Sequence, residues 1–355
     1  MLQALDTVTQ AVLGGAIAEA AFRHKLGGRA VAFGAACGLM PDLDVLMRLA
    51  GEWQSLVYHR GASHSLLILP FVALPVGAAG ARWLGGGQHR WTWVHLAFWA
   101  LITHPLLDVF TTYGTQLFAP FSRARFALDG VAIIDPIYTV PLLISMVWAA
   151  RRSADRAKSR RFAQVALAFG LVYLCAGWAL SALAQNQARN ALQAQGVTPV
   201  SMRSPTPVGF SLLRRVVAKD AKGILHINTW SPLAEGMLPW VHLLSDEDPK
   251  VDAALASEEG QIMLWFSDGY LYSKVAGRQV RMEDQRYGLY RDLRWTPFSA
   301  VAHFDEAGAL QSVRRGPRGL RPDIGAELSA GWDRLWGRAP VGNLAQHRSK
   351  QHSLH

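Results

Sequence analysis

The chain has 355 residues, of which 50% are hydrophobic and only 17% are charged, and its formal net charge is +10. Soluble domains carry about 25% charged residues, so this sequence is short of charge. The shortage is uneven, because residues 1–184 hold 24 charged side chains and residues 185–355 hold 38. The asymmetry predicts two physically different halves. The apolar majority excludes a largely disordered chain, and two cysteines exclude a disulfide scaffold or a thiolate metal site.

The first half contains long apolar segments. Three of them are long enough to cross a bilayer about 30 Å thick as helices, namely 91–112, 131–150 and 162–184. The segment 66–84 is apolar but interrupted by prolines, and two shorter segments, 7–22 and 30–49, either cross the membrane or only dip into it. We therefore expect an α-helical polytopic membrane domain of five to six apolar helices over residues 1–184. The alternative, a buried helical core of a soluble protein, rarely contains three such runs.

The distribution of Lys and Arg predicts the orientation, because basic loops stay on the cytoplasmic side of a membrane. If the helices alternate, the connections 23–29, 82–90 and 151–161 share one side and hold 11 basic residues, whereas 46–64 and 113–130 on the other side hold 4. The first set is then cytoplasmic. Six crossings would place both termini, and everything after residue 184, on the external face.

The second half is expected to be a soluble, mostly β domain over residues 203–340, preceded by a polar helical linker, 185–202, and followed by a loose tail, 341–355. Short alternating runs bounded by turn residues predict strands at 223–230, 261–267, 270–275 and 300–304. Asp268-Gly269 is typical of a hairpin turn. We expect no nucleic-acid partner, because most of the net positive charge serves membrane topology.

Ionisable side chains inside apolar segments are costly and point first to function. They are concentrated in four short motifs, which are Pro41-Asp42-Leu43-Asp44, His59-Arg-Gly-Ala-Ser-His64, His104-Pro-Leu-Leu-Asp108 and Asp135-Pro136. Under the predicted topology all four lie toward the external ends of their segments, together with Asp6. Neutral imidazole and carboxylate are the usual protein ligands of Zn²⁺ and Mn²⁺, so the pattern indicates a metal site.

The spacing within two motifs suits a shared cation. On a helix, His104 and Asp108 lie one turn apart on the same face, and the two carboxylates of Asp42 and Asp44 can bind one ion or bridge two. Each pattern also has a structural explanation: Asp42 and Asp44 could cap a helix, and His104 could be a buried histidine hydrogen-bonded to Asp108.

The remaining polar positions are more ambiguous. His59 and His64 are five residues apart, so a loop must bring them together; they could instead be solvated side chains at the headgroup boundary. For Asp135, which precedes a proline, we favour the role of helix N-cap.

These motifs, in this order over about 140 residues, resemble the YdjM/YbcI family of membrane-bound, metal-dependent hydrolases, also described as LexA-binding, inner-membrane-associated proteins. The matching segments are Asp6–Gly14, Pro41–Asp44, His59–Leu66, Thr103–Asp108, Thr111–Ser122 and Asp135–Pro136. The chain departs from the pattern at Gln10, where many relatives have histidine. The resemblance implies a protein of the bacterial inner membrane. A distant similarity of the family to zinc-dependent phospholipase C and the P1-type nucleases implies phosphoester hydrolysis.

The sequence therefore predicts a membrane-bound, metal-dependent hydrolase that cleaves a phosphoester or other ester of a lipid or lipid-linked substrate at the external face. The expected cofactor is a divalent metal, Zn²⁺ before Mn²⁺, and its expected ligands are Asp42, Asp44, His59, His64, His104 and Asp108. Asp44 or Asp6 would act as general base. Arg60, with Arg123 and Arg125, would hold an anionic substrate or anchor the headgroups.

The competing hypothesis is a membrane protein without enzymatic activity, either an ion or proton transporter or an anchor for the β domain. Transport requires polar groups that reach both faces of the membrane, whereas the Asp and His motifs are predicted at one face only. An anchor predicts that replacing His104 or Asp108 changes no activity.

Overall fold

The computed structural model describes residues 2–85, 87–151, 155–207, 209, 211–237, 239–316 and 323–338. The tail 341–355 and the side chain of Asp6 lie outside the described residues. The chain divides into two compact units, Met1–Ala179 and Leu180–His355.

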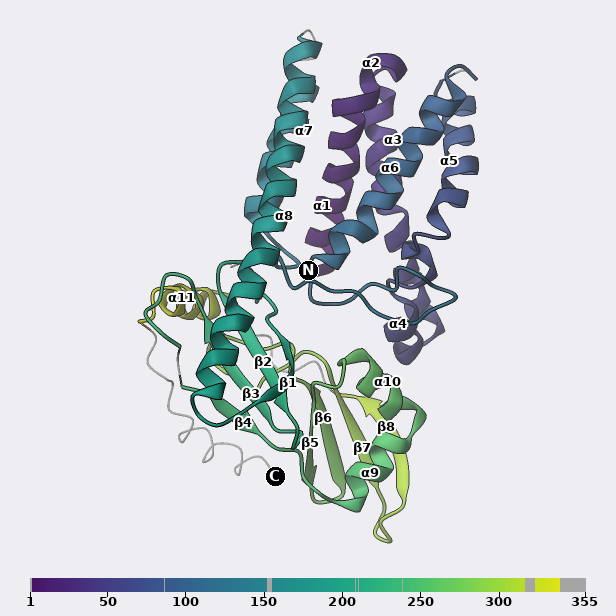
Figure 1. The fold of residues 1–355 in the computed structure, drawn as a ribbon. Helices are drawn as coiled ribbons and strands as arrows, with labels where there is room; N and C mark the ends of the chain where they lie inside the picture. The colour runs from purple at the N-terminus through teal and green to yellow at the C-terminus, as the bar shows by residue number, and fades with distance from the viewer. Residues whose placement is uncertain are drawn as a thin grey trace. The chain divides into compact units, whose positions relative to one another are not determined.

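The N-terminal unit is helical (Figure 1). Its α-helices are α1 (Leu2–Ile17), α2 (Arg23–Leu26), α3 (Arg29–Leu39), α4 (Glu52–Tyr58), α5 (Leu69–Trp83), α6 (Arg90–Val109), α7 (Pro136–Arg151) and α8 (Arg156–Gln193), the last of which continues into the second unit. A π-helix, η1 (Ala18–Phe22), joins α1 to α2, and two 3₁₀ helices, η2 (Pro41–Ala50) and η3 (Ala62–His64), flank α4.

The expectation of five to six apolar helices long enough to span a membrane is wrong. Among the described helices, only α8 is both long and apolar enough to cross a bilayer. The number rises to three if each of two bent pairs is a single span: Arg29–Leu39 with Pro41–Met47, bent by 41°, and Glu52–His64 with Leu69–Trp83, bent by 68°. The six crossings inferred from loop charge therefore have no support in the structure.

The physical reasons differ between the segments expected to span. The segment 131–150 becomes helical only at Pro136, so that α7 has 16 residues. In the segment 91–112, α6 has 20 residues, but its polar side chains include His95, His104 and Asp108, which lower its mean hydropathy. In the segment 30–49, the α-helix ends at Leu39, before Pro41 begins a 3₁₀ helix.

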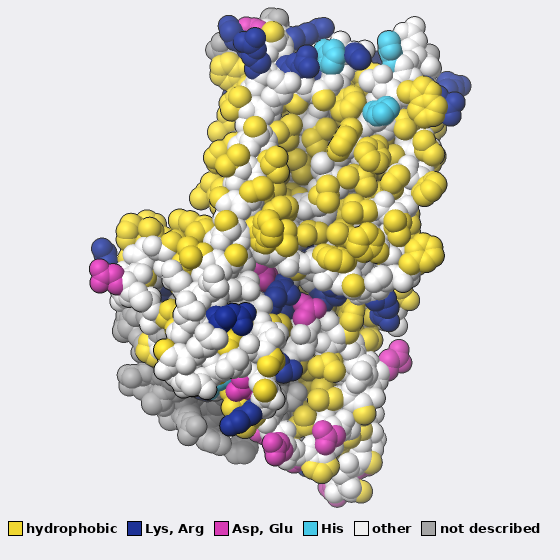
Figure 2. Space-filling model, viewed as in Figure 1, with side chains coloured by type: hydrophobic (Ala, Val, Ile, Leu, Met, Phe, Trp, Pro, Cys, Tyr) yellow, Lys and Arg dark blue, Asp and Glu magenta, His cyan; other side chains and the backbone are white. Residues whose placement is uncertain are grey.

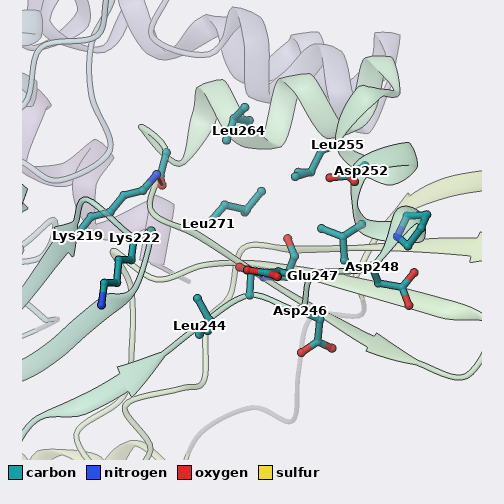
Figure 3. Close-up of a pocket in the computed structure, with 16 residues that line it drawn as sticks. Lys219, Lys222, Leu244, Asp246, Glu247, Asp248, Asp252, Leu255, Leu264 and Leu271 are labelled. Carbon is teal, nitrogen blue, oxygen red and sulfur yellow. Dashed lines mark hydrogen bonds between the residues drawn. The ribbon is translucent and has the colours of Figure 1, made fainter.

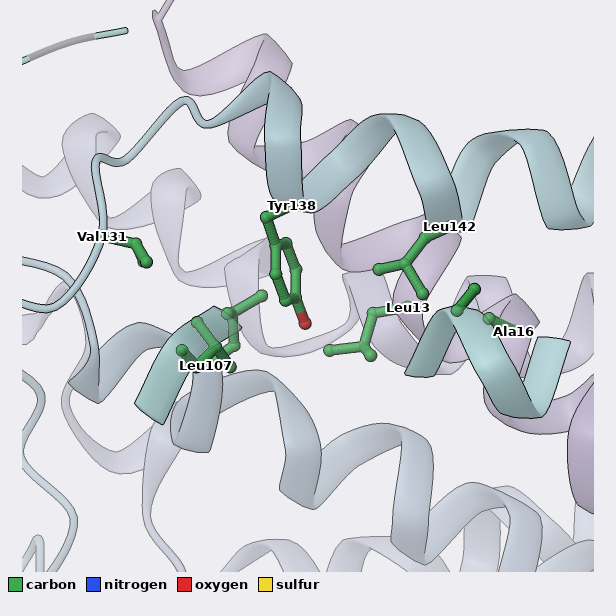
Figure 4. Close-up of a cluster of buried hydrophobic side chains, with 8 residues drawn as sticks. Leu13, Ala16, Leu107, Val131, Tyr138 and Leu142 are labelled. Atoms are coloured by element: carbon green, nitrogen blue, oxygen red, sulfur yellow. The ribbon is translucent and has the colours of Figure 1, made fainter. Parts of the chain in front are cut away.

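A hydrophobic cluster joins the N- and C-terminal helices of this unit. It consists of Leu13, Ala16, Leu107, Val131, Tyr138, Leu142, Ala166 and Leu174. Figure 4 shows side chains of α1, α6 and α7 pointing toward one another in this cluster. The cluster fixes α6, which carries two of the predicted metal ligands, against α1 and α7.

The helices α1 and α3 approach each other closely through glycine. A Cβ atom on Gly34 would lie 2.5 Å from the carbonyl oxygen of Gly14, and one on Gly38 would lie 2.5 Å from that of Gln10. Real Cβ atoms do not approach a backbone oxygen so closely, so these positions require glycine while the helices keep this separation.

The second unit contains two four-stranded antiparallel sheets. The first has the order β1 (Pro199–Arg203), β2 (Arg214–Asp220), β3 (Leu225–Trp230), β4 (Val241–Leu243), and the second β5 (Leu271–Ala276), β6 (Gln279–Asp284), β7 (Ser299–Phe304), β8 (Leu310–Arg315). The helices are α9 (Pro249–Ala256), α10 (Glu258–Phe266) and α11 (Ile324–Leu335).

The strands expected at 223–230, 270–275 and 300–304 are confirmed as β3, β5 and β7. The strand expected at 261–267 is wrong, because these residues belong to α10, whose N-cap Ser257 accepts a hydrogen bond from the amide of Gly260. Asp268-Gly269 consequently connects a helix to a strand, although both residues have the positive φ of a tight turn, 51° and 76°.

Two buried arginines brace the second unit. Arg286 donates to both carboxylate oxygens of Asp284 and to Asp268. Burial lowers the pKa of Arg286, but the charge of Asp284 raises it by more, so the pKa lies above its usual value. Arg215 donates to the backbone carbonyls of Gln285 and Leu293, and burial lowers its pKa to about 9.

A pocket of about 580 Å³ lies in this unit. Figure 3 shows Lys219 and Lys222 on one side of it and the acidic side chains of the 246–252 segment on the other. No residue of the sequence-predicted site lines this pocket.

Candidate metal centre

Three side chains from distant parts of the chain meet in the N-terminal unit. Asp42 belongs to η2, His64 to η3 and His104 to α6. The Nε2 atoms of the two histidines are 3.1 Å apart, and Asp42 Oδ1 lies 3.7 Å from that of His64 and 3.4 Å from that of His104. In the part of the chain that the structure describes, this is the group whose ligand atoms all lie close enough to hold one metal ion.

The orientation of His104 is set by the backbone of α3. Its Nδ1 lies 2.6 Å from the carbonyl oxygen of Gly38, to which it donates a hydrogen bond. In the neutral imidazole the proton is then on Nδ1, which leaves a lone pair on Nε2. A hydrogen bond from the second ring nitrogen to a carbonyl is the usual support of a metal-binding histidine.

His64 is oriented in the same way by its own loop. Its Nδ1 lies 2.9 Å from Ser63 Oγ and 3.3 Å from Asp44 Oδ2, and the Ser63 hydroxyl donates to Asp44 Oδ2 over 2.7 Å. This arrangement places the Nδ1 proton of His64 toward Ser63 and Asp44, so its Nε2 lone pair also faces the centre.

The resulting geometry fits a metal ion. Four ligands at bond lengths of about 2.0–2.1 Å in a tetrahedron are about 3.3 Å apart, and the measured separations range from 3.1 to 3.7 Å. Two neutral imidazoles would turn their lone pairs toward each other at 3.1 Å, and a cation relieves that repulsion. The histidine side chains are 0% and 1% exposed and that of Asp42 is 20% exposed, so the centre opens to its surroundings at Asp42.

Asp108 is the neighbouring carboxylate. Its Oδ2 lies 3.2 Å from His64 Nε2, 3.7 Å from His104 Nε2 and 3.1 Å from Arg60 Nε, and its Oδ1 accepts a hydrogen bond from the Gln10 amide over 3.0 Å. The side chains of Asp108 and Arg60 are 1% and 2% exposed. Asp108 can therefore act as a fourth ligand or as the ionised partner of Arg60.

Asp44 and His59 are brought close to the centre in a supporting role. Asp44 accepts hydrogen bonds from His59 Nδ1 over 2.7 Å, from the amide of Arg60 over 2.9 Å and from Ser63. These bonds tie η2 to the loop that carries His64. His59 packs its ring edge-on against Tyr113, with the ring centres 5.2 Å apart.

The arginines that were predicted to hold a substrate lie in different environments. Arg60 is buried and donates to Thr111 over 2.8 Å in addition to its contact with Asp108, so it faces the protein interior. Arg125 donates to the carbonyl of Tyr113 and lies over the ring of that residue, whereas Arg123 is exposed.

The N-cap prediction for Asp135 is confirmed. Its Oδ1 accepts hydrogen bonds from the amides of Ile137 and Tyr138 in the first turn of α7, over 3.0 and 3.3 Å. Its Oδ2 accepts a bond from the hydroxyl of Tyr173 over 2.8 Å. This carboxylate therefore stabilises the N-terminal end of α7.

The sequence did not reveal several residues that shape the centre. Gln10, which the motif comparison marked only as a departure, contacts Asp108 and is 1% exposed. Ser63 and the carbonyl of Gly38 orient the two histidines. The position of Ser63 beside His64 could have indicated its role. The role of the Gly38 carbonyl could not be inferred, because every residue has a backbone carbonyl.

Basic and hydrophobic side chains occupy separate regions of the surface of the N-terminal unit. Lys and Arg side chains gather at one of its ends, around α2 and the neighbouring end of α7, and hydrophobic side chains cover the surface next to them (Figure 2). The helices η2 and α4 lie at the opposite end of the unit (Figure 1). The candidate metal centre is thus at the end remote from this basic group.

Comparisons with known proteins agree with a membrane assignment for the first half. A family model described as "YdjM inner membrane protein" matches residues 5–185. The uncharacterized protein YfhP of Bacillus subtilis (strain 168) is 29% identical over 113 residues, which are 31% of this chain and 34% of YfhP. The chain thus aligns with about a third of the length of that relative. No solved structure matches the chain. Because the family match covers just over half of the chain and contains Asp42, His64 and His104, the chain belongs to the YdjM family of inner membrane proteins.

Proposed function

We propose that this protein is a membrane-bound, metal-dependent hydrolase. The observation that carries the proposal is the 3.1 Å separation of two imidazole nitrogens whose opposite ring nitrogens are both hydrogen-bonded, with Asp42 within 3.7 Å of each. Three protein ligands and one position open to solvent are typical of catalytic zinc sites, whereas structural zinc sites are closed by four protein ligands.

Zn²⁺, or alternatively Mn²⁺, would supply a polarising charge and a bound water whose pKa is lowered to about 7. Asp42, His64 and His104 hold the ion, and Asp108 adds negative charge beside it. Asp44 positions His64 and the 59–63 loop, because its oxygens already accept hydrogen bonds from His59, Arg60 and Ser63. This occupation of Asp44 argues against its use as general base.

The substrate that suits such a centre is an ester of a phosphate, because a metal ion neutralises the charge that develops on the phosphoryl oxygens. A centre in a membrane-embedded unit favours a lipid or lipid-linked phosphoester. Arg123 is exposed, and an arginine at the surface attracts an anionic headgroup.

This proposal is tested with full-length protein in lipid vesicles. We expect hydrolysis of phospholipids or lipid pyrophosphates that a chelator abolishes and added Zn²⁺ or Mn²⁺ restores. His104→Ala should reduce the rate at least about 10³-fold, because it removes a ligand of the catalytic ion. A wild-type rate that is indifferent to chelator would contradict metal dependence.

We also propose that the centre faces the outside of the inner membrane. The support is the basic residues before the apolar part of α8, which include Arg156, Lys158 and Arg160, because basic flanks stay in the cytoplasm. The second unit, which follows α8, would then be external.

Reporter fusions test this orientation. Alkaline phosphatase fused after residue 200 should be active, because it requires export, and the same reporter fused at residue 156 should be inactive. The reverse pattern would place the second unit in the cytoplasm and refute the assignment.

A further inference from the structure

The 3₁₀ helix η2 has two chemically different sides. With three residues per turn, positions three apart lie on the same side. One row consists of Pro41, which is buried, Asp44, whose side chain is 7% exposed, and Met47, which is half-buried. The row of Leu43, Leu46 and Leu49 is 58%, 61% and 89% exposed. We call these three residues the leucine row.

A single exposed leucine is ordinary on a protein surface, but three in one row on one short helix form an apolar stripe. This stripe belongs to the element that provides Asp42 to the metal centre and Asp44 to its supporting loop. Whatever covers the leucine row therefore lies close to the open side of the centre.

The continuity of the chain indicates what covers it. The helix α3 and the first part of η2, Pro41–Met47, together have the length and composition of a membrane span, but they are bent by 41° at their junction. A bent pair of this kind is a broken span or a re-entrant loop. Because α2, which directly precedes α3, lies at the basic end of the unit and η2 at the opposite end, we take this pair as a broken span (Figure 1). The leucine row then continues the lipid-facing surface of an inner membrane protein.

A second element next to the centre has a similar surface. The 113–126 loop is hydrogen-bonded to the segment after His64, through the amide of Leu66 to the carbonyl of Leu117 and the hydroxyl of Ser65 to the carbonyl of Ala119, over 2.9 and 2.6 Å. This loop exposes Phe121, at 87%, and Arg123. Exposed aromatic and cationic side chains together are typical of segments that lie in the headgroup region.

We propose that η2 is a lipid-binding segment at the end of this broken span, with the leucine row inserted among the acyl chains, so that the Asp42–His64–His104 centre opens at the depth of the lipid headgroups. The placement of η2 stands on its own surface and bend. The consequence that the substrate is a bilayer phospholipid headgroup rests on the proposed hydrolase function.

Fluorescence quenching by lipid tests the placement without any activity assay. An environment-sensitive fluorophore is attached to Leu46→Cys or Leu49→Cys in a Cys175→Ser background, and the full chain is reconstituted in vesicles with acyl-brominated lipids. The native Cys37 is buried and is not expected to react. Label on the native Cys175, which is exposed on α8, is the lipid-facing reference. Label on Leu244→Cys is the control outside the membrane, because Leu244 is 54% exposed in the second unit.

We expect labels at positions 46 and 49 to be quenched as strongly as label on Cys175, and label at 244 to be unaffected by brominated lipid but quenched by iodide in the water. Quenching of the 46 and 49 labels by iodide instead of by lipid would overturn the proposal. Protection from both quenchers would also overturn it, because it would mean that protein covers the leucine row.

A substrate comparison then separates the placement from the hydrolase function. In a variant with Leu43, Leu46 and Leu49 replaced by Ser, the rate of hydrolysis of a vesicle phospholipid should fall at least about tenfold, because lipid contact is lost. The metal content of this variant and its rate on soluble p-nitrophenyl phosphate should not change. Equal loss on both substrates would refute headgroup docking. If the wild type hydrolyses neither substrate, the hydrolase function fails, while the quenching result still decides the placement of η2.

Discussion

Replacing His104 by Ala should remove the bound divalent metal from the protein. Wild-type protein purified in detergent should carry near-stoichiometric zinc or manganese, and His104→Ala should keep less than about a tenth of it at equal free metal. The reason is that three side chains, those of Asp42, His64 and His104, lie close enough together to hold one ion, and loss of one leaves a pair. Elemental analysis of desalted protein measures the metal content directly.

The matched control is His95→Ala, on the same helix. His95 lies in the first half of α6 and is exposed, so its loss should leave the metal content unchanged. Wild-type protein without a divalent ion at neutral pH would contradict the proposed centre. The cluster would then be an ionic network in which protonated His64 lies between Asp42 and Asp108, at 3.7 and 3.2 Å.

Replacing Arg60 by Met should be among the most destabilising single substitutions in the N-terminal unit. Arg60 and Asp108 form a buried ion pair, with Nε and Oδ2 3.1 Å apart. Removing one partner leaves a buried carboxylate without its counter-charge, which costs about 3–5 kcal/mol. Thermal and denaturant unfolding of the detergent-solubilised protein, followed by tryptophan fluorescence in the presence of chelator, measures this loss apart from any effect of metal.

A double variant separates charge from packing. Adding Asp108→Asn to Arg60→Met removes the unpaired charge and should recover part of the lost stability. Arg82→Met, at an exposed position, should change stability by no more than about 0.5 kcal/mol. A loss of stability in Arg60→Met that Asp108→Asn leaves unchanged would show that packing, and not the ion pair, is the cause.

Sequence periodicity predicted the parts of the site that depend on local geometry. His104 and Asp108 lie one turn apart on α6, as their spacing requires, and the cap of α7 follows from Asp135 before a proline. These features are set within a few residues, so that composition and spacing suffice to predict them.

The different roles of the carboxylates of Asp42 and Asp44 could not be predicted in this way. Asp42 and Asp44 are two residues apart in one motif, but on a 3₁₀ helix they point in different directions, one toward the histidine pair and one toward the 59–63 loop. The sequence did not indicate that this segment would be a 3₁₀ helix, since its apolar residues suit an ordinary apolar helix equally well.

The number of spanning helices was overestimated for a related reason. A count of apolar residues does not show where the backbone of a helix begins or breaks. The break near Met40 ends α3 after 11 residues, and in the segment 131–150 the helix begins only at Pro136. Residues 261–267 were mistaken for a strand because a short apolar run fits either structure, and the decisive signal was the capping residue Ser257 at the preceding boundary.

The glycine contact between α1 and α3 has a chemical consequence for the candidate metal centre. Gly38 touches the backbone of Gln10 on one side and offers its carbonyl to His104 on the other. The spacing of the two helices thereby determines which ring nitrogen of His104 carries the proton. A methyl group at Gly38 would push α1 and α3 apart and move the carbonyl that accepts this proton, so that the other tautomer of His104 would become accessible.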